Sequence, residues 1–458
     1  MISPNTLLIP AFGIKNKRVY SSFPVGIYSI KEACRLAGLD VEILDFTGPV
    51  RERRFDNLDI LVDYLLTLFD PAVYHLIGLS TMAGIFPAVI SLAEKIKQIN
   101  PQTTVVLGGP HSSFLSLETL ADFPFIDAVV VGEGEYTFLE MIRAFQKSAG
   151  DWRNIPGVKI RGHRFTPREL LTNLDELPVI DYNNERLLYL QGIPDAGQIQ
   201  HEIEAIRGCY ARCRFCSTTQ FWGCRTRRKS PTRLLDEMDR LAPETGISTF
   251  HFIGDNFTFP PKVFHDTCRY LIAKNSPYRW KCDSRIGDLH EDDLKLMKDA
   301  GCVSIFVGVE SASRTTLQRI NKNIDPDRTL AMIETALKHG LEIVSSFIIG
   351  FPWERDNDLM ATLKLHSRLL EAGVSHSIVN PLFPLAGAEG FPDAKLITGF
   401  PALRESIPPF FQTGHSLEFI ERYPRHFMHF GYYDTPHLSR SYINAVLETA
   451  RQIREMRA

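Results

Sequence analysis

Short apolar runs alternate with helical patterns over the first third of the chain. Two segments, GIYSIKEACRLAG (26–38) and AVISLAEKIKQIN (88–100), place apolar residues at helical spacing, and the first ends at Gly38, a typical C-terminal stop. The apolar runs between them are compact and rich in β-branched residues, as in buried strands: NTLLIPAF (5–12), VEILDF (41–46), HLIGLST (75–81), TTVVLGG (103–109) and DAVVVG (127–132). Strands that alternate with helices predict an α/β fold with a parallel, doubly wound, Rossmann-like sheet over residues 1–145.

The same alternation returns after residue 200. Helical segments such as 231–246 and 328–340 separate six strand candidates, HEIEAIRG (201–208), TFHFIGDN (249–256), RWKCDSRI (279–286), VSIFVGVES (303–311), EIVSSFIIGFP (342–352) and VSHSIVNPLFP (374–384). Six such strands predict a partial, six-stranded β/α barrel over residues 201–390. The segment 146–200 is expected to be a linker with a small hairpin, and 391–458 a small α-rich cap with an aromatic stripe.

Small residues follow three of the first strands. They occur in Leu79–Gly84, Gly108–Ser112 and Gly132–Glu135. Ligands of open α/β sheets bind outside the carboxyl ends of the strands, and small residues there let a large ligand approach the backbone. The alternative is that these glycines only form tight turns between strand and helix.

Composition and charge are those of an ordinary globular protein. The 458 residues are 44% hydrophobic and 23% charged, with a net charge of -3, so nothing points to nucleic acid or to a membrane surface. No apolar run reaches the roughly 18 residues of a spanning helix, and the first residues lack the basic start of a signal peptide. A cytoplasmic location is the expectation.

Three of the eight cysteines are clustered. Cys209, Cys213 and Cys216 are spaced C-x3-C-x2-C directly after the first barrel strand, whereas the other five lack ligand-like spacing and are expected to be structural thiols. Cys224 lies nearest to the cluster. Three thiolates can hold three irons of a four-iron cluster and leave the fourth iron open. A structural zinc site would need a fourth ligand, for which His201 is the nearest candidate.

This cysteine pattern, with Phe215 before its last cysteine, resembles the radical SAM superfamily. Further segments occur in the order of that family: IGDN (253–256), SRIGDL (284–289), GVES (308–311) and FIIGFP (347–352). The resemblance implies a 4Fe–4S cluster on the three cysteines and S-adenosylmethionine (SAM) beside it. The SAM contacts that it implies are Phe215, Gly254, Asp255, Asn256, Arg285, Glu310, Ser311 and Ile349. Arg227 and Arg228, in a basic run, either brace the SAM carboxylate or an acidic substrate or belong to a solvated face.

With the barrel interpreted in this way, the first 145 residues resemble the cobalamin-binding domain of B12-dependent radical SAM enzymes. The cobalamin contacts that this implies are Ser80, Thr81, Gly84, Gly108, Gly109, Pro110, His111, Gly132, Glu133 and Gly134. The D-x-H-x-x-G motif that gives other B12 proteins a cobalt ligand is absent. His75 is expected to be structural, and His111 is not clearly a cobalt ligand.

The resemblance implies an enzyme that methylates an unactivated carbon or phosphorus of a small-molecule or lipid-like substrate. SAM would supply the methyl group to cobalamin and, at the cluster, the radical that activates the substrate. Relatives with the same layout catalyse cyclisation, rearrangement, oxidation or carbon–carbon coupling, and a B12- or redox-sensing protein is a remote alternative. A reductant such as flavodoxin or ferredoxin is the implied partner. One cluster is expected, because no other cysteine pair indicates a second.

Overall fold

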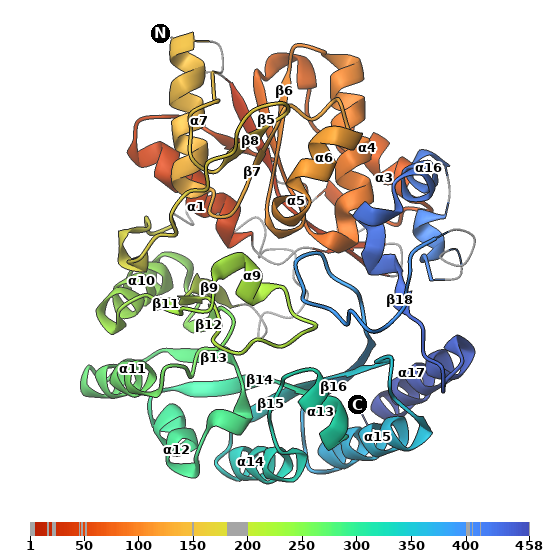
Figure 1. Cartoon of the computed structure of the whole chain (residues 1–458). Helices are drawn as coiled ribbons and strands as arrows, with labels where there is room; N and C mark the ends of the chain where they lie inside the picture. Colours follow the sequence, from red (N-terminus) through yellow and green to blue (C-terminus); the bar gives the residue numbers. More distant parts are fainter. Residues whose placement is uncertain are drawn as a thin grey trace.

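Two six-stranded sheets organise the chain, one in each half, and Figure 1 shows the two halves stacked on one another. This computed structural model describes residues 5–457 except 16–17, 21–23, 45, 47–48, 51–52, 149–150, 181–199, 400–403, 405 and 413. The second part of the expected linker, residues 181–199, therefore lies outside the described residues.

The first sheet is doubly wound, as the alternation of elements predicts. Its strands, in spatial order, are β4 (Glu42–Ile43), β1 (Thr6–Ile9), β5 (Leu76–Ser80), β6 (Thr104–Gly108), β7 (Ala128–Val130) and β8 (Val158–Ile160). All pairs are parallel except β7 with β8. On β5, Ile77 packs into the core beside α3 and α4, and Leu76 into the core beside α1 and α7. Because helices cover both faces, the strands are continuous apolar runs.

Strand β8 differs from the sequence-based expectation. Residues 158–160 were expected in a hairpin of the linker, but they pair antiparallel with β7 and form the edge of the first sheet. The alternating apolar pattern is too short there to distinguish an added edge strand from a separate hairpin.

The second sheet is a parallel half-barrel. Its order is β16 (His376–Pro381), β15 (Glu342–Ile349), β14 (Cys302–Glu310), β13 (Arg279–Ser284), β12 (Thr249–Ile253) and β9 (His201–Glu204). Phe250 and Phe252 on β12 are fully buried under the outer helices, while His251 and Ile253 between them are only half-buried. Side chains alternate across a strand, so the barrel has an apolar outer face and an inner face of mixed polarity.

Helices cover the outer faces, and their first turns show why they begin where they do. Ser230 accepts a hydrogen bond from the Arg233 N–H with Pro231 at the first helical position, and Asp325 with Pro326 does the same for a later helix. In the first half the helices are α1 (Val25–Leu36), α3 (Leu58–Leu66), α4 (Phe86–Ile99), α5 (Pro110–Phe114), α6 (Ser116–Asp122) and α7 (Glu135–Ser148). In the second half they are α9 (Thr218–Trp222), α10 (Pro231–Thr245), α11 (Pro261–Ala273), α12 (Glu291–Asp299), α13 (Arg314–Arg319), α14 (Pro326–Lys338) and α15 (Asp356–Glu371).

The C-terminal segment joins the two halves. Helix α16 (Gly414–Arg422) and the 3-10 segment η8 (Pro424–Phe430) pack on α3 and α4, whereas α17 (Arg440–Glu455) runs along β16 and α15 (Figure 1). Phe427 and Phe430 lie in the core of the first half. These two aromatic residues of the tail are therefore core, whereas Tyr432 and Tyr433 are half-buried. Short two-stranded pairs complete the fold: β2 (Gly13–Lys15) with β3 (Arg18–Tyr20), β10 (Ile206–Arg207) with β11 (Arg227–Arg228), and β17 (Leu396–Ile397) with β18 (Tyr432–Tyr433).

Within the part of the chain that the structure describes, no helix has the length and apolar character that crossing a membrane requires.

Candidate active site between the two sheets

The cysteine loop lies between β10 and α9 and is fixed at both ends by one carboxylate. Asp255, directly after β12, accepts hydrogen bonds from the Gly208 N–H and from the Thr218 hydroxyl, each at 3.0 Å. Cys209 and Cys213 are buried and Cys216 is half-buried. The loop therefore holds three thiols at the carboxyl end of the first barrel strand, where the sequence places them.

Two cationic side chains lie near the buried thiols and partly offset the effect of burial on their ionisation. Burial raises the pKa of Cys209 to about 11, and burial likewise raises that of Cys213 while the nearby Lys322 and Arg285 act in the opposite direction. Arg285 Nη1 lies 3.5 Å from Cys213 Sγ. Among the described residues, no three His, Cys, Asp or Glu side chains converge on a single ion. A four-iron cluster requires no such convergence, because each thiolate binds a different iron.

Four of the expected SAM contacts surround the loop. Gly254 packs directly against Ile206, and Asp255 holds the cysteine loop as described. Asn256 Oδ1 accepts from the Arg285 backbone N–H at 3.3 Å, while the buried Asn256 Nδ2 has no hydrogen-bond partner in the described structure. A buried amide without a partner is costly, so this donor fits a bound polar group.

The remaining expected SAM contacts differ in their surroundings. Glu310 adopts a left-handed φ of 66° and its carboxylate lies 2.9 Å from Lys322 Nζ, both groups buried. A non-glycine residue in that conformation is uncommon and marks functional sites. Ser311 contacts the Thr362 hydroxyl, and Ile349 packs with α15 and α17. Phe215 lies near Phe351.

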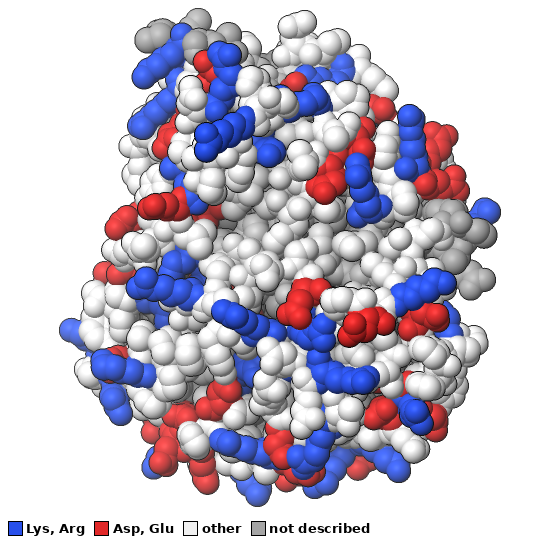
Figure 2. Space-filling model, in the orientation of Figure 1, with Lys and Arg blue, Asp and Glu red and all other residues white. Residues whose placement is uncertain are grey.

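A cavity of about 500 Å³ lies between the strand ends of the first sheet and the inner face of the second. Seven of the ten expected cobalamin contacts line it: Ser80, Gly108, Gly109, Pro110, Gly132, Glu133 and Gly134. Gly109 has a φ of 97°, and a Cβ there would lie 2.6 Å from the Thr81 carbonyl oxygen, so only glycine fits. In Figure 2, a largely uncharged hollow separates the two halves on this face.

The other three expected cobalamin contacts are not among the cavity-lining residues. Thr81 is buried and its hydroxyl donates to the Gly108 carbonyl at 2.8 Å, and Gly84 lies in the turn before α4. His111 is buried against the C-terminal segment, where its Nε2 lies 2.9 Å from the His426 carbonyl oxygen. His75, expected to be structural, accepts a hydrogen bond from the Asn5 N–H.

Several cavity residues were not found from the sequence. Phe221 and Trp222 of α9 line it, as do Glu202, Glu204 and His251 on the inner barrel face. His251 Nε2 lies 3.4 Å from the Asp283 carboxylate on the adjacent strand. The period-two alternation of β12 could have placed His251 on the inner face, but a lone histidine carries no signal that distinguishes it from a surface residue.

The two arginines of the basic run make contacts within the protein. Arg227 donates to Glu133 of the first half at 2.5 Å, and the half-buried Arg228 donates to the carbonyl oxygens of Phe257 and Phe259. Burial lowers the pKa of Arg228 to about 10. Neither guanidinium belongs to a solvated face.

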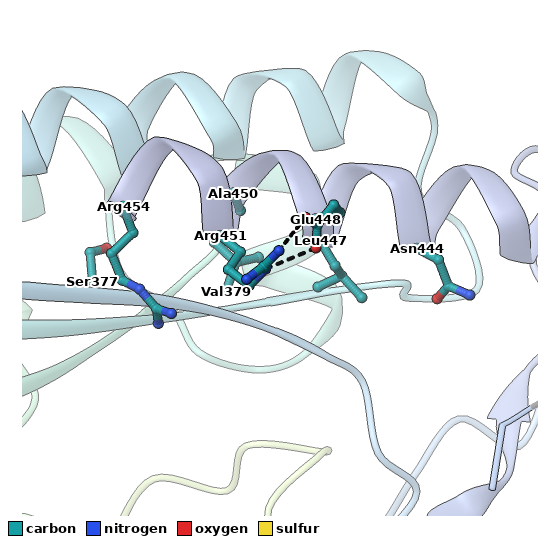
Figure 3. Close-up of a pocket in the computed structure, with 8 residues that line it drawn as sticks. All are labelled: Ser377, Val379, Asn444, Leu447, Glu448, Ala450, Arg451 and Arg454. Carbon is teal, nitrogen blue, oxygen red and sulfur yellow. Dashed lines mark hydrogen bonds and ion pairs between the residues drawn. The ribbon is translucent and has the colours of Figure 1, made fainter. Parts of the chain in front are cut away.

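A second cavity, of about 390 Å³, lies between α17 and the barrel edge (Figure 3). Asn444, Arg451 and Arg454 line it from α17, opposite Ser377 and Val379 of β16. Ser377 points to the outer face, where its hydroxyl contacts His366 of α15. This cavity contains none of the expected site residues.

Comparison with known proteins agrees with this geometry. Residues 203–366 match the model of the radical SAM superfamily, and residues 13–142 match that of the B12 binding domain. An uncharacterized methyltransferase of Pyrococcus horikoshii is 33% identical over 336 residues, which cover 72% of this chain and 70% of the relative. The chain belongs to the B12-binding radical SAM enzymes. The cofactors of this family are a 4Fe–4S cluster, SAM and cobalamin.

More distant relatives of this B12-binding radical SAM enzyme share its layout. Cytidylyl-2-hydroxyethylphosphonate methyltransferase of Streptomyces wedmorensis is 26% identical over 417 residues, covering 80% of this chain and 77% of the relative. The fold is similar to the solved radical SAM methyltransferase TsrM of Kitasatospora setae. That match has a TM-score of 0.73 and 16% identity, and covers 99% of this chain and 89% of the solved one.

Proposed function

We propose that this enzyme transfers a methyl group from SAM, by way of cobalamin, to an unactivated carbon or phosphorus of a small-molecule substrate. The observation that carries the proposal is the shared cavity: strand ends of the first sheet and the inner face of the second line the same space of about 500 Å³. The methyltransferase relatives support it.

In this proposal, Cys209, Cys213 and Cys216 hold the cluster, and the turn at Gly254–Asn256 together with Glu310 binds SAM. Gly108–Pro110 and Gly132–Gly134, which line the cavity, would hold the corrin. When bound, the cluster and SAM supply a 5'-deoxyadenosyl radical, and cobalamin carries the methyl group. The protein's contribution is to orient these groups and to exclude water, since Phe221, Trp222 and the half-barrel surround the cavity. An electron donor such as flavodoxin or ferredoxin and a cytoplasmic location belong to the same proposal.

The first test follows the methyl group without knowledge of the acceptor. Protein purified without oxygen is reconstituted with iron, sulfide and hydroxocobalamin, reduced chemically and given SAM with a deuterated methyl group. We expect retained corrinoid and deuterated methylcobalamin by mass spectrometry, and none in a sample without protein. Release of 5'-deoxyadenosine with unlabelled corrinoid would instead favour cyclisation, rearrangement, oxidation or coupling. Failure to retain corrinoid would contradict both.

The inner barrel face gives a prediction about the substrate. We expect His251→Gln to lower kcat/KM for methyl transfer about 10- to 100-fold, the equivalent of one or two hydrogen bonds to the substrate. Bound corrinoid and cluster absorbance should be unchanged. The matched control is His265→Gln, which removes a similar pair at the outer helices, where His265 Nε2 lies 2.6 Å from Asp293. Unaltered kinetics in His251→Gln would exclude a role in substrate binding.

A further inference from the structure

Arg207 connects the two halves of the enzyme through buried ion pairs. It ends β10, and its side chain is only 2% exposed. Its guanidinium donates to Glu133 at 2.9 Å and to Glu135 at 2.5 Å, both in the first half. It also donates to Glu204 of its own half at 2.8 and 2.9 Å. One planar group thus binds three carboxylates from two domains.

The carboxylates on the other side belong to the loop that lines the cavity. Glu133 lies between Gly132 and Gly134, and its second oxygen accepts from the Leu171 N–H at 2.7 Å. Arg227 is the second cation that binds Glu133. The Trp222 ring lies 4.9 Å from the Arg207 guanidinium. Both carboxylate oxygens of Glu133 therefore have donors, so a change in this loop that does not also move Arg207 breaks a buried ion pair.

The charges in this network depend on one another. Burial alone raises the pKa of Glu135, but the Arg207 guanidinium outweighs it and holds that pKa below its usual value. Loss of Arg207 would leave Glu135 without its cation in a buried environment, which is strongly unfavourable.

Arg207 is also tied to the cysteine loop, which begins two residues later. Gly208 between them has a φ of 91°, and a Cβ there would lie 2.7 Å from the Arg225 carbonyl oxygen. Its N–H donates to Asp255, which also holds Thr218 at the far end of the loop. The backbone between Arg207 and Cys209 is therefore constrained, so a displacement of Arg207 should also displace Cys209.

We propose that Arg207 makes corrinoid binding and cluster assembly cooperative. Corrinoid on the Gly132–Gly134 loop would order Glu133 and Glu135, these carboxylates would fix Arg207, and Arg207 would fix the start of the cysteine loop. Linkage requires the reverse effect of equal size, so an assembled cluster tightens corrinoid binding. The inference rests on the proposed function only in assigning the two cofactors to these two loops.

The test measures corrinoid affinity and does not depend on turnover. Hydroxocobalamin is titrated anaerobically, without SAM or acceptor, into iron-free protein and into protein with a reconstituted cluster. In the wild type we expect the dissociation constant to fall at least about fivefold on cluster assembly, the lower end of typical couplings. In Arg207→Lys the ratio should approach one, because a single ammonium cannot span three carboxylates.

Two further variants keep the result interpretable. Glu135→Gln removes one charge with little change in shape and carries the test if Arg207→Lys does not fold. Arg161→Lys is the matched control, since Arg161 bonds the carbonyl oxygens of Leu120, Phe123 and Ile126 within the first half alone. A ratio of one in the wild type, or an unchanged ratio in a folded Arg207 or Glu135 variant, would overturn the proposal. Absence of methyl transfer would contradict the proposed function but not the proposed cooperativity between corrinoid and cluster.

Discussion

Replacing Cys213 with alanine is expected to abolish cluster binding and, with it, all SAM cleavage. Three thiolates supply the protein ligands of the cluster, and two leave a second iron without a ligand. Cys213 lies in the buried part of the loop, 3.5 Å from Arg285 Nη1, where water cannot readily replace the missing sulfur. The measurement is iron and sulfide content, with the cluster absorbance, after anaerobic reconstitution.

The matched control is Cys224→Ala. Cys224 is the cysteine that follows the loop most closely, but its side chain is exposed and its sulfur lies 3.2 Å from Arg212 Nε. This variant should keep about four irons per chain and the full absorbance, as one cluster requires. A cluster in Cys213→Ala, or its loss in Cys224→Ala, would show that the ligand set has been assigned incorrectly.

The sheets and the cysteine loop could be predicted because their signals are local. Residues such as Ile77 and Val105 stand in short β-branched runs between helical segments, and that alternation defines a doubly wound sheet wherever it occurs. The C-x3-C-x2-C spacing lies within eight residues of one loop. The cysteine loop follows the first barrel strand in the sequence. In the structure it lies at the end of that strand.

The contacts between distant segments could not be predicted in this way. The ion pair of Glu133 with Arg227 is one example, because a sequence does not show that two opposite charges 94 residues apart meet in a buried network. His111 was assigned to cobalamin from its place in GGPHS, yet the tail that covers it begins some 300 residues later. Such pairings depend on how the two halves and the tail dock.

The docking of the tail makes acid stability the other large expected effect. His111 and His429 lie in an aromatic cluster with Phe86 and Phe430, and neither ring nitrogen of His429 has a hydrogen-bond partner in the described structure. Burial lowers the pKa of His111 to about 4 and that of His429 to about 3. Burial also lowers the pKa of the nearby His426. His426 Nε2 lies 2.8 Å from the carboxylate of Asp122, which also pairs with Arg425. The folded state therefore keeps these rings neutral.

Below a pH of about 6.5 these histidines bind protons in the unfolded chain but remain neutral in the folded chain. The free energy of unfolding therefore falls as the pH falls. Between pH 7 and pH 5 the loss in the free energy of unfolding is about 2 kcal/mol for each of His111 and His429.

His429→Phe should remove the loss of about 2 kcal/mol that His429 contributes. The variant should be at least as stable as the wild type at pH 7, because a buried unpaired polar group is replaced by an apolar ring. Urea unfolding at both pH values measures this, with His437→Gln, an exposed histidine, as the control. Equal pH dependence in the wild type and in His429→Phe would contradict the lowered pKa of His429 in the folded state.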